Sequence, residues 1–273
     1  MANNKWNEEN LIIFFSHPTK LYKPVICNDV CLCGPGIDVS GKIMEDLLSS
    51  NSNTLTKPLL LLYSFFQNQV MNEYQIHIAE EAKKVVTDIF KTKVNPLFIF
   101  HNIVHTCRVI KSAEEIEKYY QLNDDDQFVL FISAWFHDTG FSAGKAEGHE
   151  KESIKLAADF LNHHYAEQEI LLKVSSCIQA THIPQQPLNL VEKIMCDADL
   201  YHLGTNMFTK WNECLRKEYQ NYYKSDISNE EWRKFNIGFL NSHNFFTGYC
   251  QQKLGPIKQR WIKQLQNKQE TMV

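Results

Sequence analysis

Residues 128–140 have the sequence FVLFISAWFHDTG, an apolar run that ends in two polar side chains. Phe128 and Trp135 lie seven residues apart, so they share one face of a predicted helix, and this apolar face is expected to be buried. The run ends at His137 and Asp138, just before Thr-Gly, and glycine commonly follows the end of a helix. Successive side chains on a regular helix point about 100° apart. We therefore expect the last turn to open, so that both polar side chains reach one site.

A pair of histidines precedes this helix, in the sequence FHNIVH at residues 100–105. His101 and His105 are four residues apart and are predicted to lie on one face of a helix. Val109 and Ile116 continue that face, so both imidazoles are expected to point into the protein. Buried imidazoles without partners are energetically costly, and a metal ion or a substrate would supply the missing partner.

Three further polar side chains fall on apolar faces of predicted helices: His149, His182 and Asp199. Asp199 lies in the apolar sequence MCDADL at residues 195–200, and a buried carboxylate needs a partner such as a cation. Asp197 lies about 200° around the helix from Asp199. We expect Asp197 to cap, to bridge or to face water.

Imidazoles and carboxylates together suit a divalent metal ion and differ from an all-thiolate site. The sequence therefore predicts a divalent cofactor, with one or two ions of Mn, Mg, Fe, Ni or Zn per chain. Two ions would lie about 3.5–4 Å apart, with Asp138 as the bridge between them.

The fold is predicted to be all-α, an irregular multi-helix bundle. Hydrophobic residues make up 44% of the 273 residues, enough for a large buried core. Helical periodicity is nearly continuous from Pro58 onward, and the alternation typical of strands is absent. We expect an N-terminal extension of unknown role at residues 1–57 and one helical domain at residues 58–273. The predicted helices are 58–75, 77–92, 97–120, 126–138, 147–164, 167–182, 189–203, 205–222, 229–241 and 244–268.

Charge and composition restrict the partners. The net charge of −4 argues against a nucleic-acid duplex as partner, because such a surface needs a basic excess, but it is compatible with a small anionic substrate. The longest apolar run, residues 58–66, is shorter than the roughly 20 residues that span a bilayer, so no membrane association is expected. The N-terminal sequence MANNKWNEEN is polar, so we expect no signal peptide and a cytoplasmic protein with reduced thiols. A zinc site at Cys27, Cys31 and Cys33 is an alternative for part of the eight cysteines. A homodimer is one option for the oligomeric state.

The order of His105, His137-Asp138 and Asp199 resembles the H…HD…D signature of the HD superfamily of metal-dependent phosphohydrolases. The resemblance implies a helical fold of the HD-domain/phosphodiesterase type and a metal ion held by these four side chains. It is most specific as a combination, since a single His-Asp pair is common in proteins.

Two further features extend the resemblance. FHNIVH is similar to the Y-H-N-x-x-H segment of class I cyclic-nucleotide phosphodiesterases, which implies that His101 is the proton donor and His105 a metal ligand. His149 and His182 fall where two-metal members have extra histidines. Residues 75–268 resemble a group of bacterial predicted HD phosphohydrolases. The glutamine and aromatic clamp that contacts the base in the phosphodiesterases has no recognisable counterpart in this sequence.

These observations predict hydrolysis of a phosphoester, a nucleotide or cyclic nucleotide, by metal-activated water. The alternatives are a single-metal nucleotidase, a catalytically silent HD-type ligand sensor or regulatory binding protein, and a di-iron oxygenase. The assignments are catalytic His101, Asp138 and His149; metal ligands His105, His137, Asp138, His149, His182 and Asp199; and substrate-binding Arg216, Lys217 and Lys258.

Overall fold

The computed structural model describes four stretches of the chain: residues 25–27, 30–32, 57–224 and 226–267. Two units divide the chain, Met1–Phe66 and Gln67–Val273. The described residues of the second unit form helices and connecting segments, and none of them lies in a strand, which confirms the all-α prediction. None of the described helices combines the length and apolarity that crossing a membrane requires.

The first unit contains a short antiparallel strand pair that the sequence did not predict. Strand β1 (Val25–Cys27) pairs with strand β2 (Val30–Leu32). The alternative zinc site at Cys27, Cys31 and Cys33 lies outside the residues whose side chains are described.

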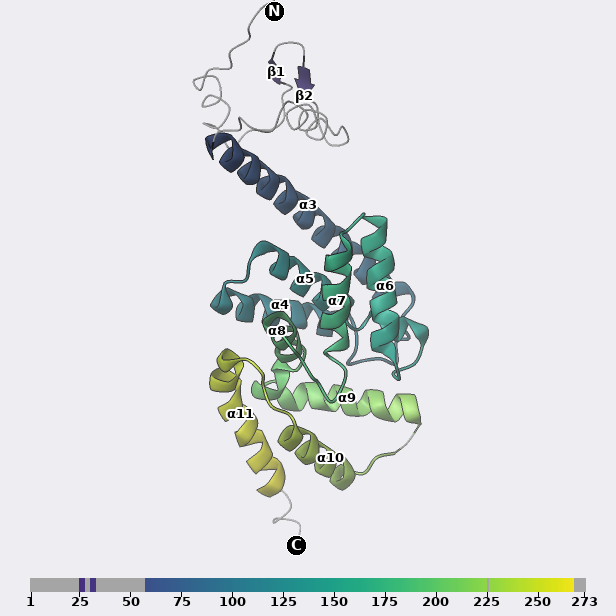
Figure 1. Cartoon of the computed structure of the whole chain (residues 1–273). Coiled ribbons are helices and arrows are strands. Elements are labelled where there is room, and N and C mark those ends of the chain that lie inside the picture. Colours follow the sequence, from purple (N-terminus) through teal and green to yellow (C-terminus); the bar gives the residue numbers. More distant parts are fainter. Residues whose placement is uncertain (1–24, 28–29, 33–56, 225, 268–273) are drawn as a thin grey trace, which may run out of the picture. The chain divides into compact units, whose positions relative to one another are not determined.

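Nearly all of the described chain outside these strands is helix or a short connection between helices. Figure 1 shows α9, α10 and α11 together on one side of the group α4–α8. Helix α5 packs against α4, α6, α7 and α8, so it is the central element of the second unit. The helices are α3 (Lys57–Thr92), α4 (Ile103–Tyr120), α5 (Asp124–Phe136), α6 (His149–His163), α7 (Gln168–Gln179), α8 (Leu190–Asp199), α9 (Phe208–Tyr223), α10 (Asn229–Ser242) and α11 (Gly248–Asn267), with the 3-10 helices η2 (Thr139–Ala143) and η3 (Tyr201–Gly204).

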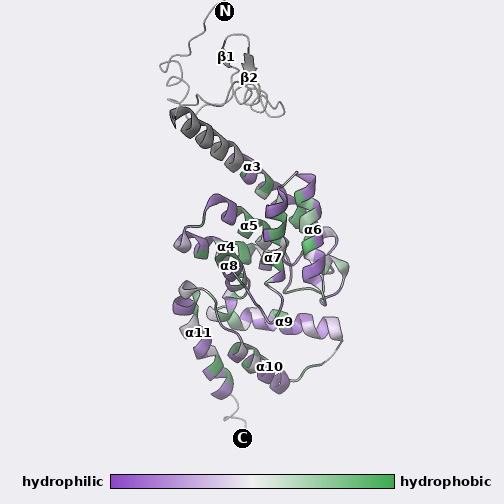
Figure 2. Cartoon of the chain, viewed as in Figure 1, coloured by the Kyte–Doolittle hydropathy of each residue, from purple (hydrophilic) through white to green (hydrophobic). Residues whose placement is uncertain are grey.

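Helix α5 is stabilised at its start and buried along its length. The side chain of Asn123 caps it by accepting a hydrogen bond of 2.9 Å from the backbone N–H of Asp126. The acidic residues of its first turn interact favourably with the positive end of the helix dipole. Leu130, Ile132 and Phe136 are fully buried, and Figure 2 shows how hydrophobic this helix is. The rigid core therefore extends up to the residue before His137.

One predicted helix boundary is absent. Helix α3 is continuous, whereas the sequence analysis predicted a break near residue 76. Ile78, Ala82 and Val86 are buried at helical spacing, and neither proline nor glycine interrupts residues 73–92. The apolar face of the helix therefore continues through the predicted break.

Helix α4 begins at Ile103, six residues after the predicted start. The Asn102 side chain caps it by accepting hydrogen bonds from the N–H groups of Val104 at 2.9 Å and His105 at 3.3 Å. His101 therefore precedes the helix, and the prediction that it shares a helical face with His105 is wrong. Other predicted boundaries lie within a few residues of the observed ones.

Asp197 is fully buried and joins α8 to the start of α11. Its carboxylate accepts hydrogen bonds from the N–H of Phe246 at 2.8 Å, and from the N–H and hydroxyl of Thr247 at 2.8 and 2.6 Å. Of the three roles left open by the sequence, capping and bridging are correct, and exposure to water is wrong.

Candidate metal centre

His137 and Asp138 lie where α5 gives way to η2. His137 is the last residue with helical geometry, and Asp138 leaves it with φ −106° and ψ 3°. The Nε2 atom of His137 consequently lies 3.2 Å from Oδ2 of Asp138. The opening of the last turn brings both side chains to one site, as the sequence predicted.

Helices α4 and α8 bring two more side chains to the same point. His105 Nε2 lies 3.0 Å from Asp199 Oδ1 and 3.4 Å from His137 Nε2. One donor atom each from His105, His137 and Asp199 lies within 4.8 Å of the others. These three residues could hold a metal ion, and we call them with Asp138 the HD cluster.

The buried carboxylate of Asp138 fits a cation in this position. Its Oδ2 atom is buried without a hydrogen-bond partner, although the Nε2 atoms of His137 and His105 lie 3.2 and 3.4 Å from it. Such an atom is costly to bury unless a positive ion satisfies it. The donor set of imidazole and carboxylate is also the one that divalent ions prefer. The four residues of the HD cluster therefore fit a divalent metal ion.

Hydrogen bonds on the outer nitrogens set the ring tautomers. His137 donates from Nδ1 to the carbonyl oxygen of Ala134 at 2.9 Å, and His149 from Nδ1 to that of Ala146 at 2.8 Å. A neutral ring that donates from Nδ1 keeps an unprotonated Nε2, which is the form that binds metal. The Nε2 of His149 lies 3.4 Å from Asp138 Oδ1, so this histidine adjoins the HD cluster.

The charges of the cluster shift its pKa values strongly. Burial raises the pKa of Asp138, but His137 and His149 outweigh it and hold that pKa well below its ordinary value. Burial likewise opposes the charged form of His137, and the Asp138 carboxylate holds the pKa of His137 well above its ordinary value. For His105 burial prevails over Asp199, and its pKa is lowered. The carboxylates thus stay ionised, as metal ligands must.

The contact between η2 and α6 positions His149. Ser153 Oγ donates to the carbonyl oxygen of His137 at 2.6 Å and accepts from the N–H of Gly140 at 2.8 Å. A Cβ atom on Gly140 would lie 1.9 Å from the carbonyl oxygen of His149. Only glycine allows this approach, which carries α6 close to Asp138.

His182 reaches the site through Glu150. Its Nδ1 lies 2.8 Å from Glu150 Oε1, while the other oxygen of Glu150 lies 3.6 Å from His149 Nδ1. The His182 side chain is 57% exposed and has no direct contact with the HD cluster among the described residues. Glu150 was not among the predicted site residues, although a carboxylate on the apolar helical face of Ala157 and Leu161 was a usable signal.

His101 is fixed by a carboxylate that the sequence analysis also missed. Glu218 Oε2 accepts from the N–H groups of Phe100 at 2.7 Å and His101 at 3.0 Å, and the His101 ring donates from Nδ1 to Oε1. Burial opposes protonation, but Glu218 prevails and raises the pKa of His101. The ring stacks on Phe141 at 4.4 Å between centroids. Glu218 lies among the apolar residues of one face of α9, and this position was its signal.

The three cations assigned to the substrate lie elsewhere. Arg216 donates to the side chain of Asn229 at 2.7 Å and to the carbonyl oxygen of Ile227 at 2.6 Å. Lys258 is buried and donates to the carbonyl oxygen of His243, while Lys217 is exposed. None of the three lines the cavity at the HD cluster. Arg216 and Lys258 thus bond to residues at the start and just after the end of α10 and in the loop before it, and the sequence alone did not show these contacts.

A cation that the sequence analysis did not consider lies behind His105. The guanidinium of Arg108 is 3.3 Å from His105 Nδ1, and its Cζ is 3.1 Å from the centroid of the Trp211 ring. Burial lowers the pKa of Arg108 to about 10. Arg108 and Trp211 thus support the face of His105 that points away from the HD cluster.

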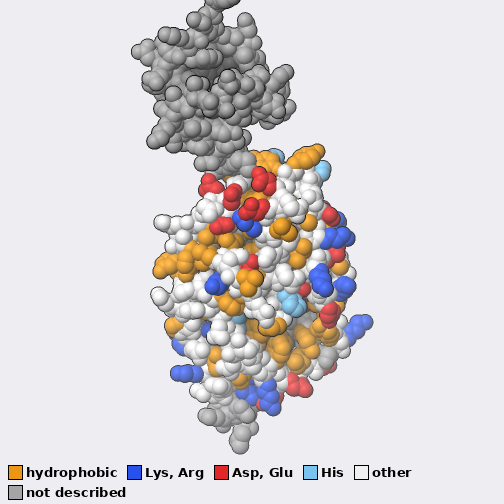
Figure 3. All heavy atoms as spheres, in the orientation of Figure 1, with side chains coloured by type: hydrophobic (Ala, Val, Ile, Leu, Met, Phe, Trp, Pro, Cys, Tyr) orange, Lys and Arg blue, Asp and Glu red, His pale blue; other side chains and the backbone are white. Residues whose placement is uncertain are grey.

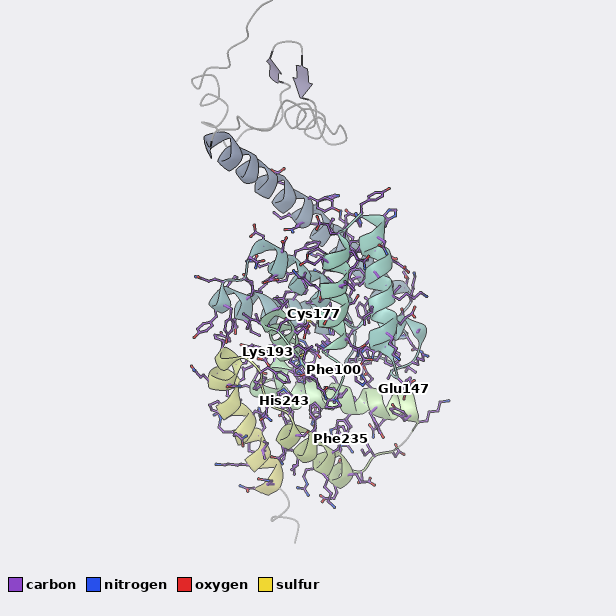
Figure 4. The ribbon with its side chains drawn as sticks, viewed as in Figure 1. Phe100, Glu147, Cys177, Lys193, Phe235 and His243 are labelled. Carbon is purple, nitrogen blue, oxygen red and sulfur yellow. The ribbon has the colours of Figure 1, made fainter. Side chains whose placement is uncertain are left out.

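A cavity of about 360 Å³ opens in front of the HD cluster. Its walls come from the segment before α4, from α6 and η3, and from α9 and α10. Figure 4 labels two wall residues, Phe100 near α9 and Phe235 on α10. Burial lowers the pKa of His202, at one side of the cavity, to about 3, so this ring is neutral. The polar and charged lining residues are His101, Asp138, His149, Glu150, Thr181, Asp199, His202, Asn212 and Asn236.

Comparison with known proteins bears on the same part of the chain. The family model described as HD domain matches residues 102–204, which include His105, His137, Asp138 and Asp199. Comparison with curated proteins and with solved structures gave no match. Residues 102–204 of the chain are therefore an HD domain.

Proposed function

We propose that this protein is a metal-dependent hydrolase of phosphoesters, with a nucleotide or cyclic nucleotide as substrate. The observation that carries the proposal is the buried Asp138 Oδ2 atom, which lacks a hydrogen-bond partner and lies beside the donor atoms of His105, His137 and Asp199. If Asp138 had no role besides packing, an apolar side chain in its place would make the folded state more stable.

His105, His137, Asp138 and Asp199 would hold the first ion. His149 adjoins Asp138 and would take part in a second site, with Glu150 between His149 and His182. A bound divalent ion neutralises charge on phosphoryl oxygens and supplies hydroxide near neutral pH. The chain's own contribution is to keep the carboxylates ionised and the imidazole Nε2 atoms turned inward.

His101 would donate the proton that the leaving oxygen needs. Its Nδ1 is engaged by Glu218, so the Nε2 proton of the charged ring is the one available, and the residue lines the cavity. Glu218 keeps the ring charged over a wider pH range, because it raises the pKa of His101. A positioned general acid of this kind contributes roughly a hundredfold or more to the rate.

The test is phosphate release from a panel of nucleoside monophosphates, cyclic nucleotides and p-nitrophenyl phosphate. Protein stripped with a chelator should be inactive and should recover activity with one of Mn²⁺, Mg²⁺, Fe²⁺, Ni²⁺ or Zn²⁺. Asp138→Ala should lose activity by at least about a thousandfold, whereas Asp159→Ala, on the exposed face of α6, should retain it. Absence of turnover across the panel with the metal bound would contradict the proposal.

A ligand sensor is the second candidate, since a folded cavity can bind a phosphoester without cleaving it. Tight binding of a panel member that stays intact after prolonged incubation with the metal-loaded protein would favour it.

A further inference from the structure

The cavity at the HD cluster is lined by carboxylates and histidines but by no lysine or arginine. Asp138, Glu150 and Asp199 contribute carboxylates to its lining, and neither lysine nor arginine occurs among the described residues that line it. Arg108 lies on the far side of His105, in a separate cavity. The positive charge available to an anionic substrate would therefore come from a bound metal ion and from the protonated His101 ring, which is assigned to the leaving oxygen.

The charge of the cavity lining limits how many phosphoryl groups a substrate can have. Proteins that bind di- and triphosphates commonly place lysine or arginine against the additional phosphates. Here a second or third phosphate would meet the Glu150 and Asp199 carboxylates without a lysine or arginine to offset their charge. A single phosphoryl group can be held at the metal alone.

The other end of the cavity is apolar and aromatic. Phe208 and Leu215 of α9 line it together with Phe235 and Phe239 of α10. The Phe235 ring stacks on Trp232 and Phe239, but the residue is still 54% exposed, so part of its apolar surface remains uncovered. Figure 3 shows hydrophobic side chains gathered over α9 and α10, beside a histidine. A flat aromatic group of the substrate would cover this surface by stacking.

Two amide side chains lie among the apolar wall residues. Asn236 donates from Nδ2 to the carbonyl oxygen of Trp232 at 2.7 Å, which leaves its Oδ1 as an acceptor. Asn212 makes no hydrogen bond to another described residue, so both its donor and its acceptor are available. Ring nitrogens and exocyclic groups of a heteroaromatic ring would satisfy such amides.

We infer that the substrate has one phosphoryl group and an uncharged, nitrogen-bearing aromatic ring, as in a nucleoside monophosphate, with the ring between Phe235 and the Asn212 and Asn236 amides. The inference rests on the proposed function, because it takes the HD cluster as the place where the phosphoryl group binds. The chain should therefore hydrolyse substrates with more than one phosphate at a lower kcat/KM.

The first experiment compares adenosine mono-, di- and triphosphate as substrates of the full chain with its activating metal. The monophosphate should have a kcat/KM at least about tenfold above that of the triphosphate. Equal or better hydrolysis of the triphosphate would overturn the inference and leave the proposed function standing. Failure to hydrolyse any phosphoester, with the metal bound, would instead overturn the proposed function.

The second experiment uses variants of the wall. Phe235→Ala should raise KM for adenosine monophosphate about tenfold and leave KM for glycerol phosphate, which has no ring, unchanged. Leu172→Ala removes an apolar side chain that is 62% exposed on α7, outside this cavity, and should change neither value. A Phe235→Ala effect that is equal for both substrates would contradict the stacking role.

A third variant tests the charge argument directly. Asn212→Lys places a cation in the wall and should raise kcat/KM for the triphosphate relative to the monophosphate by about tenfold. An unchanged ratio in a folded Asn212→Lys protein would show that charge in the cavity does not set the preference.

Discussion

Glu218 and His101 show how single residues set the chemistry of this site. The Glu218 carboxylate accepts hydrogen bonds from the backbone before α4 and also favours the protonated form of the His101 ring, which lines the cavity. His101 has a raised pKa because of Glu218, although burial acts in the opposite direction. The protonated ring is therefore present up to a higher pH than that of an ordinary histidine.

Glu218→Gln should move the alkaline limb of the activity profile to lower pH. The amide can still accept hydrogen bonds from the backbone, but it no longer stabilises the charged ring, so His101 loses its proton earlier as pH rises. At pH 8 kcat should fall by roughly tenfold. The measurement is kcat against pH, with Glu213→Gln on the exposed face of α9 as control. A profile that keeps its position would contradict the acid role of His101.

His243 offers a second prediction, for stability. Burial, aided by Lys258, lowers the pKa of His243 to about 4. The unfolded chain takes up this proton near pH 6.5, whereas the folded chain takes it up only near pH 4. The contribution of neutral His243 to the free energy of unfolding is therefore complete above pH 6.5 and is lost as the pH falls from 6.5 to 4. That loss amounts to about 3 kcal/mol. In urea unfolding, His243→Asn should lose less stability than the wild type from pH 6.5 to 4; parallel curves would contradict the assignment.

At the scale of elements, the site depends on the short contact between η2 and α6. Sequence periodicity could identify His105, His137 and Asp199, because each is a polar residue on or at the end of an apolar helical face. It could not place Arg216 or Lys258, because helical spacing does not show which loop or carbonyl a side chain meets. The late start of α4 was hidden too, since it depends on capping by Asn102 and on Glu218, more than a hundred residues away in the chain.

Gly140→Ala should weaken the site by separating η2 from α6. The new Cβ would lie 1.9 Å from the carbonyl oxygen of His149, so the helix must move. We expect a loss of about 1–3 kcal/mol in unfolding free energy and weaker metal binding. Gly238→Ala in α10 is the matched control, because its Cβ would have no neighbour within 4 Å and alanine favours a helix by up to about 1 kcal/mol. Equal stability of the two variants in urea unfolding would contradict this role for Gly140.

At the scale of the whole molecule, the helices of the second unit surround a charged cluster that is costly without a cation. Residues from α4, from the end of α5 and from α8 meet at the HD cluster, and α9 and α10 close the cavity in front of it. A metal ion bound there would link three parts of the chain that are far apart in sequence.

Metal binding should therefore stabilise the folded chain. At a free metal concentration of about one hundred times the dissociation constant the gain is about 2.7 kcal/mol, which for a domain of this size raises Tm by about 5–10 °C. The measurement is thermal unfolding of chelator-stripped protein with and without each divalent ion. A Tm that no divalent ion changes would contradict a folded-state metal site.

The most direct measurement of the central claim is the number of divalent ions bound per chain by stripped and reloaded protein, determined by elemental analysis and by Mn²⁺ titration. Wild-type protein should bind at least one ion, and Asp199→Asn should bind it at least about tenfold more weakly, while Asp159→Asn should match the wild type. No stoichiometric ion in the wild type, or equal binding by Asp199→Asn, would contradict the metal centre.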